Sequence, residues 1–347
     1  MRCGEFRTSY AADMAIFDTS FSRRLLWAFL FALATVPLFA TTYWLDVLNR
    51  IGIAVIAAMG LNILTGFSGQ ISLGNAAFLA VGGYTTAVLA GRLDLPFLIV
   101  IPVSGLVTAV VGMFFGVPSL RLKGLYLAMA TLAAHFVVEF TVVHWEGMTG
   151  GVNGMSVPAP ALGPLELDDD AAMFWLILPL SAFLLWFAKN LFRTRVGKAF
   201  VAIRDHDISA EVMGVNVFRH KLLSFGISSF YVGVAGSLLA YQARIISPEN
   251  FPITVAIDHL GMIIIGGLGS IVGSIFGAVF ITLLPEVLRL LTGALSDAYP
   301  ALVGLFAPLR MGIFGLAIML FLIFEPDGMA ARWRTIRDYW KLYPFSY

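Results

Sequence analysis

The sequence predicts an all-α polytopic membrane protein with about 10 transmembrane helices. Of its 347 residues, 59% are hydrophobic and only 12% are charged, and the mean hydropathy is +0.88. A soluble domain carries roughly 25% charged residues, so this chain has too few to cover a water-facing surface. Apolar runs of about 20 residues, the length that crosses a bilayer, recur along the chain. The net charge of +1 gives no indication of nucleic-acid binding.

The predicted spans follow these apolar runs. The first run, near 25–45, is longer than the roughly 7–15-residue core of a secretory signal peptide, so we expect an uncleaved span. Glycines between 266 and 273 interrupt the eighth and ninth runs, so eight full spans plus a re-entrant hairpin are the alternative. The ten runs lie near 25–45, 47–66, 73–91, 96–118, 124–143, 172–191, 222–244, 255–270, 271–294 and 308–325.

The positions of Lys and Arg predict the orientation, because cytoplasmic loops are enriched in them. With the N-terminus inside, only five of the 22 Lys and Arg residues fall outside. The loop 144–171 has neither and carries several carboxylates, so we expect it to be periplasmic. The expected organisation is a cytoplasmic segment 1–24, a transmembrane domain 25–325 and a cytoplasmic tail 326–347, with both termini inside the cell.

The longest cytoplasmic loop, 192–221, is expected to contain a short amphipathic helix. Asp207 is a good N-cap because its carboxylate can accept from the free amides of a first turn. Ile208 and Val212 lie at i, i+4 on one face, joined by Met213, and Gly214 suits the left-handed position that ends a helix. The apolar strip lies on lipid headgroups, packs on the chain's own spans, or docks into a groove of a partner.

A glycine-rich stretch, "GFSGQISLGN" at 66–75, interrupts the apolar sequence. Non-helical backbone at membrane depth occurs only where it is buried in protein or lines a cavity, and such breaks point to the path of a transporter. We therefore consider Ser68, Gln70, Ser72 and Asn75 as candidates for lining a solute path; a cytoplasmic turn is the competing interpretation. The second half offers a similar break at 266–274. For the other paired glycines we favour close helix packing: Gly82, Gly83, Gly233, Gly236, Gly273 and Gly277.

Three carboxylates fall inside the predicted spans, where a charge costs at least about 2.5–3.5 kcal/mol. Glu139 follows His135 by four residues, so an internal pair is the simpler account, and Glu139 is also kept as a candidate path residue. Glu286 precedes Arg289 by three and is expected to pair with it. Asp258 and His259 are expected near the outer end of their span, within reach of water.

Four segments resemble the membrane subunits of ABC importers for branched-chain amino acids, in particular the M-type subunit. In chain order they are "GLNILTGFSGQISLGNAAFLAVGGYTTAVL", "GMTGGVNGMSVP", "RTRVGKAFVAIRDHDISAEVMGVNVFRHKLLSFGISSFYVGVAGSLLAY" and "LGMIIIGGLGSIVGSIFGAVFITLLPEVLR". The resemblance covers about residues 50 to 330. It implies a heterodimer with an H-type permease subunit, two ABC ATPase subunits that drive transport, and a periplasmic solute-binding protein, all at the inner (plasma) membrane of a bacterial cell. Glu211 and Gly214 match the family's ATPase-coupling motif, whose usual alanine is replaced here by Val212.

The residues support this division of labour. A phosphate-binding P-loop needs Gly-x-x-x-x-Gly-Lys-Ser/Thr, but the Gly197-Lys198 pair is followed by Ala199 and preceded at the required position by Phe192. ATP and any cofactor are thus expected on other chains. A metal site is not expected from one cysteine and five scattered histidines. We find no Gly-x-Ser-x-Gly or His-Glu-x-x-His motif, so an enzyme is disfavoured.

The expected solutes are branched-chain or other hydrophobic amino acids. Urea, amides and organic or aromatic acids are the alternatives within the same importer family. An ATP-independent carrier or channel is the third hypothesis, and it would not need a capped amphipathic helix in a basic loop.

Overall fold

The computed structural model describes residues 20–119, 122, 124–162, 165–298, 303–325 and 327–342, and these residues are predominantly helical. Two short antiparallel ribbons, β1 (Met155–Ser156) with β4 (Ile245–Ile246) and β2 (Ala161–Leu162) with β3 (Leu165–Glu166), belong to one end of the bundle. The α-helices are α2 (Ser20–Thr35), α3 (Thr42–Asn62), α4 (Asn75–Leu93), α5 (Phe97–Ser119), α6 (Leu125–His144), α7 (Glu146–Thr149), α8 (Asp170–Leu191), α9 (Arg195–Val212), α10 (Val217–Ala243), α11 (Ile253–Gly266), α12 (Ile271–Ala298), α13 (Val303–Phe324) and α14 (Met329–Leu342).

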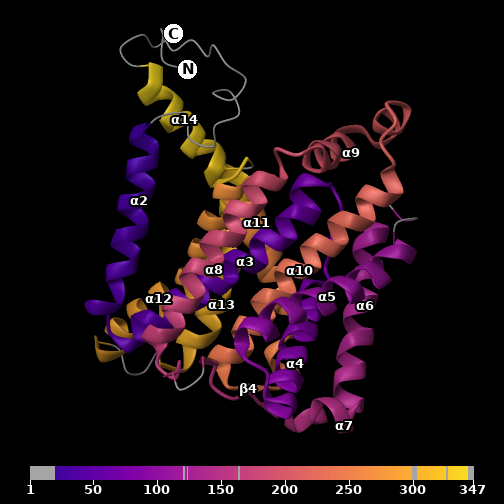
Figure 1. Cartoon of the computed structure of the whole chain (residues 1–347). Coiled ribbons are helices and arrows are strands. Elements are labelled where there is room, and N and C mark those ends of the chain that lie inside the picture. The colour runs from indigo at the N-terminus through magenta and orange to yellow at the C-terminus, as the bar shows by residue number, and fades with distance from the viewer. Residues whose placement is uncertain are drawn as a thin grey trace.

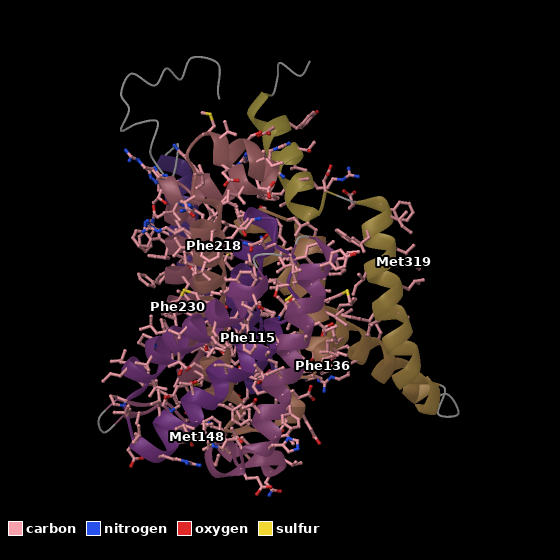
Figure 2. All side chains as sticks on the ribbon, turned by 90° about the vertical axis from the view of Figure 1, so that its right-hand side faces the viewer. Phe115, Phe136, Met148, Phe218, Phe230 and Met319 are labelled. Atoms are coloured by element: carbon pink, nitrogen blue, oxygen red, sulfur yellow. The ribbon has the colours of Figure 1, made fainter. Side chains whose placement is uncertain are left out.

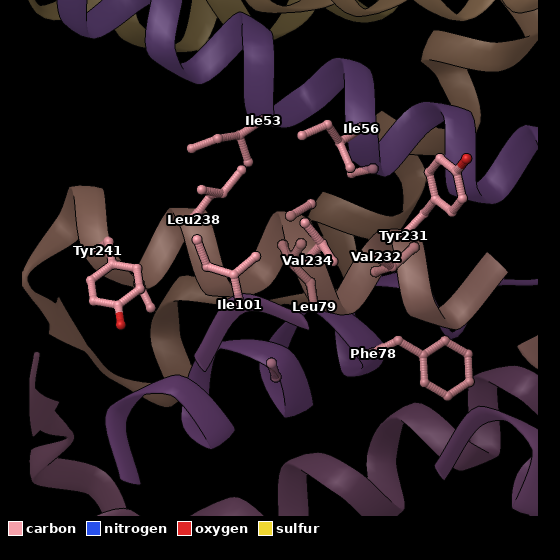
Figure 3. Close-up of a cluster of buried hydrophobic side chains, with 14 of the residues drawn as sticks. Ile53, Ile56, Phe78, Leu79, Ile101, Tyr231, Val232, Val234, Leu238 and Tyr241 are labelled. Carbon is pink, nitrogen blue, oxygen red and sulfur yellow. The ribbon is translucent and has the colours of Figure 1, made fainter. Parts of the chain in front are cut away.

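Helix α10 is the centre of the bundle and packs against α3, α4 and α5 (Figure 1). Its buried face carries Val234 and Leu238, which meet Ile53 of α3 in one hydrophobic cluster (Figure 3). Leu79 of α4 and Ile101 of α5 complete this part of the cluster. An apolar helix that is buried on all sides in this way is typical of the interior of a membrane bundle.

Small residues let α10 and α4 approach closely, as expected for packed membrane helices. A β-carbon on Gly82 would overlap the carbonyl of Gly233, and one on Gly236 would overlap the carbonyl of Leu79. Gly277 of α12 meets the Met262 carbonyl of α11 in the same manner. The packing interpretation of these glycines is therefore confirmed.

Seven helices among the described residues are long and apolar enough to cross a membrane, or up to eight if α13 and α14 form one bent span. The predicted first span, 25–45, is wrong in its boundaries: α2 ends at Thr35, a 3₁₀ turn covers Val36–Leu38, and α3 begins at Thr42. Pro37 lies in this turn, and proline has no backbone N–H with which to continue a helix. The last residues of the predicted first span therefore belong to α3.

Helices α11 and α12 form a hairpin around the second glycine break, as the re-entrant alternative expects, but α12 is itself long and apolar enough to cross a membrane, so only α11 falls short of a full span. Helix α11 has 14 residues, about 21 Å at roughly 1.5 Å per residue, whereas the hydrocarbon core is about 30 Å thick. The segment before α11 already reaches the middle of α4, where Phe251 contacts Tyr84 with ring centroids 6.2 Å apart. Helix α11 thus starts inside the bundle, short of the end that carries α7 and β4, and is too short to span a membrane alone.

The two ends of the bundle differ in character. Helices α9 and α14 lie at one end, and α7 and β4 lie at the other (Figure 1). Between the ends, large apolar side chains such as Phe136 and Met319 project outward (Figure 2) and are exposed in the isolated chain. An apolar outer surface of this extent fits a lipid or protein environment rather than water. Of the predicted terminal segments, residues 1–19 and 343–347 lie outside the described part of the chain.

Candidate functional site

The first glycine break is a buried turn that joins α3 to α4. Helix α3 continues as one π-helical turn, Ile63–Phe67, and α4 begins at Asn75. The Gln70 amide nitrogen donates to the hydroxyls of Ser68 at 2.8 Å and Ser224 of α10 at 2.7 Å. Asn75 contacts the ring nitrogen Nδ1 of His259 in α11 at 2.8 Å. These hydrogen bonds tie the turn to α10 and α11, and Ser68, Gln70, Ser72 and Asn75 are all buried.

The two glycine breaks, far apart in sequence, lie against each other. Asn62 at the end of α3 joins them: its amide nitrogen donates to the Ser270 carbonyl at 2.9 Å and to the Ser274 hydroxyl at 2.7 Å. Its amide oxygen accepts from the backbone N–H of Gly269 at 2.9 Å. One side chain thus bonds to three polar groups of the α11–α12 turn and the start of α12, and buried backbone groups such as the Gly269 N–H need a partner of this kind. The Ser270 carbonyl also accepts from the Ser274 N–H at 3.1 Å.

Arg204 connects helix α9 to both breaks. Its guanidinium donates to the Gly66 carbonyl at 3.1 Å, and a β-carbon on Gly269 would lie 2.9 Å from the same nitrogen. The neighbouring Asp205 carboxylate accepts two bonds from Arg204, at 2.9 and 2.8 Å, and orients it. The backbone of Gly69, at φ +73°, leaves room for the aliphatic part of this arginine.

A cavity of about 400 Å³ lies between the first break, α9 and the start of α6. Of the four candidate path residues in the first break, Ser68 and Gln70 line this cavity, whereas Ser72 and Asn75 do not. Arg204, Asp207 and Lys221 supply its charged wall, where Asp207 and Lys221 form an ion pair at 3.6 Å. The structure therefore connects part of the first break to the loop between α8 and α10.

The short amphipathic helix of this loop is the second half of α9. The backbone is non-helical at His206 (φ −161°, ψ 98°), which separates 207–212 from the rest of α9. The break thus lies one residue before the predicted N-cap, Asp207. The carboxylate of Asp207 pairs with Lys221, and the ring of His206 contacts the Ser209 hydroxyl at 3.2 Å.

The end of this helix follows the prediction. Gly214 has φ +86° and its N–H bonds to the Glu211 carbonyl at 2.9 Å. The N–H of Val215 bonds to the Ala210 carbonyl at 3.0 Å, which completes a Schellman motif.

The apolar strip of this helix is uncovered. Ile208 is 62% exposed, and Val212 and Met213 are each 83% exposed; Glu211 is exposed beside them. The strip therefore does not pack on the chain's own described spans, which removes one of the three alternatives. An apolar strip on a charged loop gains free energy by burial at about 25 cal/mol per Å², so its exposure indicates a missing neighbour.

The candidate path residue Glu139 lies in the half of α6 that leads to α7 and does not line the cavity at the first glycine break. Its carboxylate is 3.7 Å from Nε2 of His135, longer than a hydrogen bond. Glu286 forms the predicted ion pair with Arg289 at 3.2 Å and also accepts from the Tyr43 hydroxyl.

Asp258 and His259 were expected within reach of water, and for His259 this prediction is wrong. Helix α11 starts at depth, so His259 is buried against Asn75 at the first residue of α4.

The acidic loop between α6 and α8 is tied to the end of α10. Strand β1 pairs with β4, and Arg244 forms an ion pair with Asp168 at 2.9 Å. Thr149 holds the glycine-rich turn that follows α7 by donating to the Val142 carbonyl at 2.6 Å. The loop is thereby fixed to the bundle rather than free of it.

Three residues that join these parts were not singled out from the sequence: Asn62, Arg204 and Ser224. Asn62 carried a signal, because it is a lone amide in an otherwise apolar run four residues before Gly66. Arg204 looked like one more charge in a basic loop. In the part of the chain that the structure describes, no group of three His, Cys, Asp or Glu side chains is placed to hold a metal ion.

Comparison with known proteins extends these observations. The high-affinity branched-chain amino acid transport system permease protein LivM of Salmonella typhimurium is 31% identical over 329 residues, which cover 87% of this chain and 74% of that protein. Its counterpart from Escherichia coli is 30% identical over 340 residues, 91% of this chain and 76% of that protein. The ribose import permease protein RbsC of Haemophilus influenzae is 24% identical over 257 residues, 71% of this chain and 77% of that protein. No solved structure matches.

A family model described as "Branched-chain amino acid transport system / permease component" matches residues 43–323, which include both glycine breaks, α9 and the α11–α12 hairpin. The relatives and the family are transport permeases, which agrees with an integral membrane chain whose apolar helices surround a polar turn. The chain belongs to the family of permease components of branched-chain amino acid transport systems.

Proposed function

We propose that this chain is a membrane-spanning subunit of an ATP-driven importer that moves branched-chain or other hydrophobic amino acids into the cell. It would act with an H-type permease subunit, two ABC ATPase subunits and a periplasmic solute-binding protein, in the inner membrane of a bacterium with both termini in the cytoplasm. The supporting observation is the exposed helix 207–214, whose apolar strip is uncovered while Arg204 of the same α9 contacts the Gly66 carbonyl.

The proposed mechanism uses this connection. The strip of Ile208, Val212 and Met213, with Glu211 beside it, would press into a groove of an ATPase subunit. Movement of that subunit would pull on α9, and Arg204 would transmit the movement to the two glycine breaks that Asn62 holds together. Coupling of this kind requires a physical element with two arrangements that both sites bias. The turn around Ser68 and Gln70 is the proposed moving element.

The solute is supported by the family and by the two LivM relatives, whose names state branched-chain amino acids. The similarity to a ribose permease shows that related chains serve other solutes. Urea, amides and organic or aromatic acids therefore remain the alternatives within the same importer mechanism. An ATP-independent carrier is the competing class.

The test is uptake of radiolabelled leucine into proteoliposomes that contain this chain, its H-type partner, the ATPase subunits and the loaded binding protein. We expect uptake to require ATP, and Glu211→Ala to reduce it by about tenfold or more, within the range of coupling free energies of about 1–3 kcal/mol. The matched control is Asp338→Ala, which removes an exposed carboxylate of α14 at the same end of the bundle and is expected to leave uptake unchanged.

Each result is informative. Leucine uptake without ATP or without the ATPase subunits would reject the importer in favour of a carrier. ATP-dependent uptake of urea or of an organic acid, but not of leucine, would keep the mechanism and change the solute. Full uptake by Glu211→Ala in an assembled complex would show that this helix does not couple the chain to the ATPase subunits.

A further inference from the structure

A second, smaller cavity lies in the outer half of the bundle between α4, α6 and the segment that precedes α11. Its volume is about 10 Å³, close to the space that one water molecule needs. Three polar side chains border it: Tyr84 of α4, and His135 and Glu139 of α6. The rest of its wall is mainly apolar and includes Ala77, Ala80, Val138, Val142 and Phe251.

Three buried polar atoms beside this cavity have no hydrogen-bond partner among the described residues. Tyr84 is 5% exposed and His135 is 1% exposed, yet the Tyr84 hydroxyl and both ring nitrogens of His135 make no hydrogen bond to any described residue. A buried polar group without a partner costs about 1–3 kcal/mol, and native proteins contain few of them. Three such atoms around one small cavity indicate that a ligand group fills it for part of the time.

The chemistry of the three side chains identifies that group. A tyrosine hydroxyl, a neutral imidazole nitrogen and a carboxylate each present an acceptor. A water molecule could bond to them, but it carries no charge to neutralise Glu139, and an unneutralised carboxylate is costly in a membrane-spanning helix. A primary ammonium group has the size of a water molecule, donates three hydrogen bonds and neutralises the carboxylate.

We propose that this cavity is a transient subsite for the ammonium group of the transported amino acid. The inference rests on the proposed function and adds to it the residues that would recognise the solute. Glu139 is 47% exposed, so it forms the open side of the site. Helix α6 lies at the edge of the bundle (Figure 1) and faces the viewer in Figure 2, where Phe136 marks its middle. The enclosed space admits the ammonium group alone, and the hydrocarbon part of the solute lies outside, beyond Glu139.

The site itself can be tested without transport. The probe is isobutylammonium, with isobutanol as the uncharged analogue of the same shape, added to the complex of this chain with its partner subunits in detergent. We expect the ammonium, and not the alcohol, to raise the unfolding temperature by about 2 °C or more at saturation. Glu139→Gln and Tyr84→Phe should each abolish the rise. Asp258→Asn, an intramembrane carboxylate that does not line the cavity, should retain it.

The outcomes separate this inference from the proposed function. Equal unfolding temperatures with the ammonium and the alcohol, or a rise that persists in Glu139→Gln, would overturn the subsite, whatever the transport assay shows. With the wild-type complex active on leucine, Tyr84→Phe should lower uptake per ATP hydrolysed by about fivefold or more, and an unchanged ratio would also overturn it. Absence of leucine uptake in the wild type would count against the proposed solute, while the ammonium-specific rise would still decide the site.

Discussion

At the scale of single residues, the closest helix contacts of this protein depend on the absence of a side chain. At Gly236, α10 approaches α4 so closely that a β-carbon would overlap the carbonyl oxygen of Leu79. The obstacle is backbone of a neighbouring helix, so it cannot move aside as a flexible side chain would. The distance between α4 and α10 is therefore set by this glycine and by Gly82, which meets Gly233 in the same way.

Gly236→Ala is predicted to destabilise the protein by about 1–3 kcal/mol, the usual cost of forcing extra volume into a packed core. Thermal unfolding in detergent measures this loss. The matched control is Gly312→Ala, because among the described residues no atom outside the adjoining turns of α13 lies within 4 Å of a β-carbon at that position. Alanine favours a helix over glycine, so the control should be neutral or slightly stabilising. Equal unfolding temperatures for the two variants would show that α10 can move away from α4.

At the scale of elements, one amide side chain holds two broken helices together. Asn62 closes α3 and bonds to the backbone of Gly269 and Ser270 in the α11–α12 turn and to the hydroxyl of Ser274 in the first turn of α12. Both segments have left the helical conformation, so their backbone groups need partners from elsewhere. The first break in turn receives the guanidinium of Arg204. The two breaks and α9 therefore form one connected unit.

Asn62→Leu is predicted to destabilise this unit by about 1–3 kcal/mol, because the Gly269 N–H loses its acceptor and the Ser270 carbonyl loses one of its donors, while the side-chain volume is nearly kept. Thermal unfolding and ATP-dependent uptake measure the two consequences, and both should fall. Asn190→Leu is the control, because Asn190 donates only to the Trp186 carbonyl of its own helix α8 among the described residues; its effect should stay within about 0.5 kcal/mol. A variant Asn62→Leu with unchanged stability would mean that the breaks are held by packing alone.

At the scale of the whole molecule, the arrangement separates two chemically different ends. The loop that contains α9 is basic, and the loop near α7 and β4 carries several carboxylates. Positively charged loops remain in the cytoplasm during insertion. The proposed orientation therefore places the exposed helix 207–214 inside the cell and the acidic loop outside, where a binding protein would dock or where the loop would cap the path.

Accessibility of single cysteines tests this orientation. Cys3 is the only cysteine of the chain, so Cys3→Ser provides a background without thiols. In spheroplasts, a membrane-impermeant maleimide should label Val152→Cys, which is exposed in the outer loop. Ser209→Cys, exposed on α9, should react only after the membrane is permeabilised. Labelling of Ser209→Cys in intact spheroplasts would invert the topology and place the proposed coupling helix on the wrong side for ATP.

The sequence by itself determined the class of the protein and the local features of its helices. Composition and apolar run length are sums over residues, so they identified a membrane bundle without any knowledge of contacts. Gly214 and the strip of Ile208, Val212 and Met213 were predictable because helix termination and helical periodicity depend only on neighbours in the chain. The break before this helix lies at His206, one residue before the predicted N-cap Asp207. The sequence did not show that the Asp207 carboxylate pairs with Lys221.

Only the tertiary structure determined which residues far apart in the chain contact one another. Asn62, Gly66, Arg204 and Gly269 are separated by up to 207 residues, and only the packing of α3 against the α11–α12 hairpin brings them together. The depth of His259 and the unpartnered groups of Tyr84 and His135 were hidden for the same reason: burial and hydrogen-bond satisfaction are properties of pairs of elements. Local sequence determines where each helix begins and ends and which face is apolar. The close approach of helices at glycines determines which polar groups meet, and we place the function of this protein at those groups.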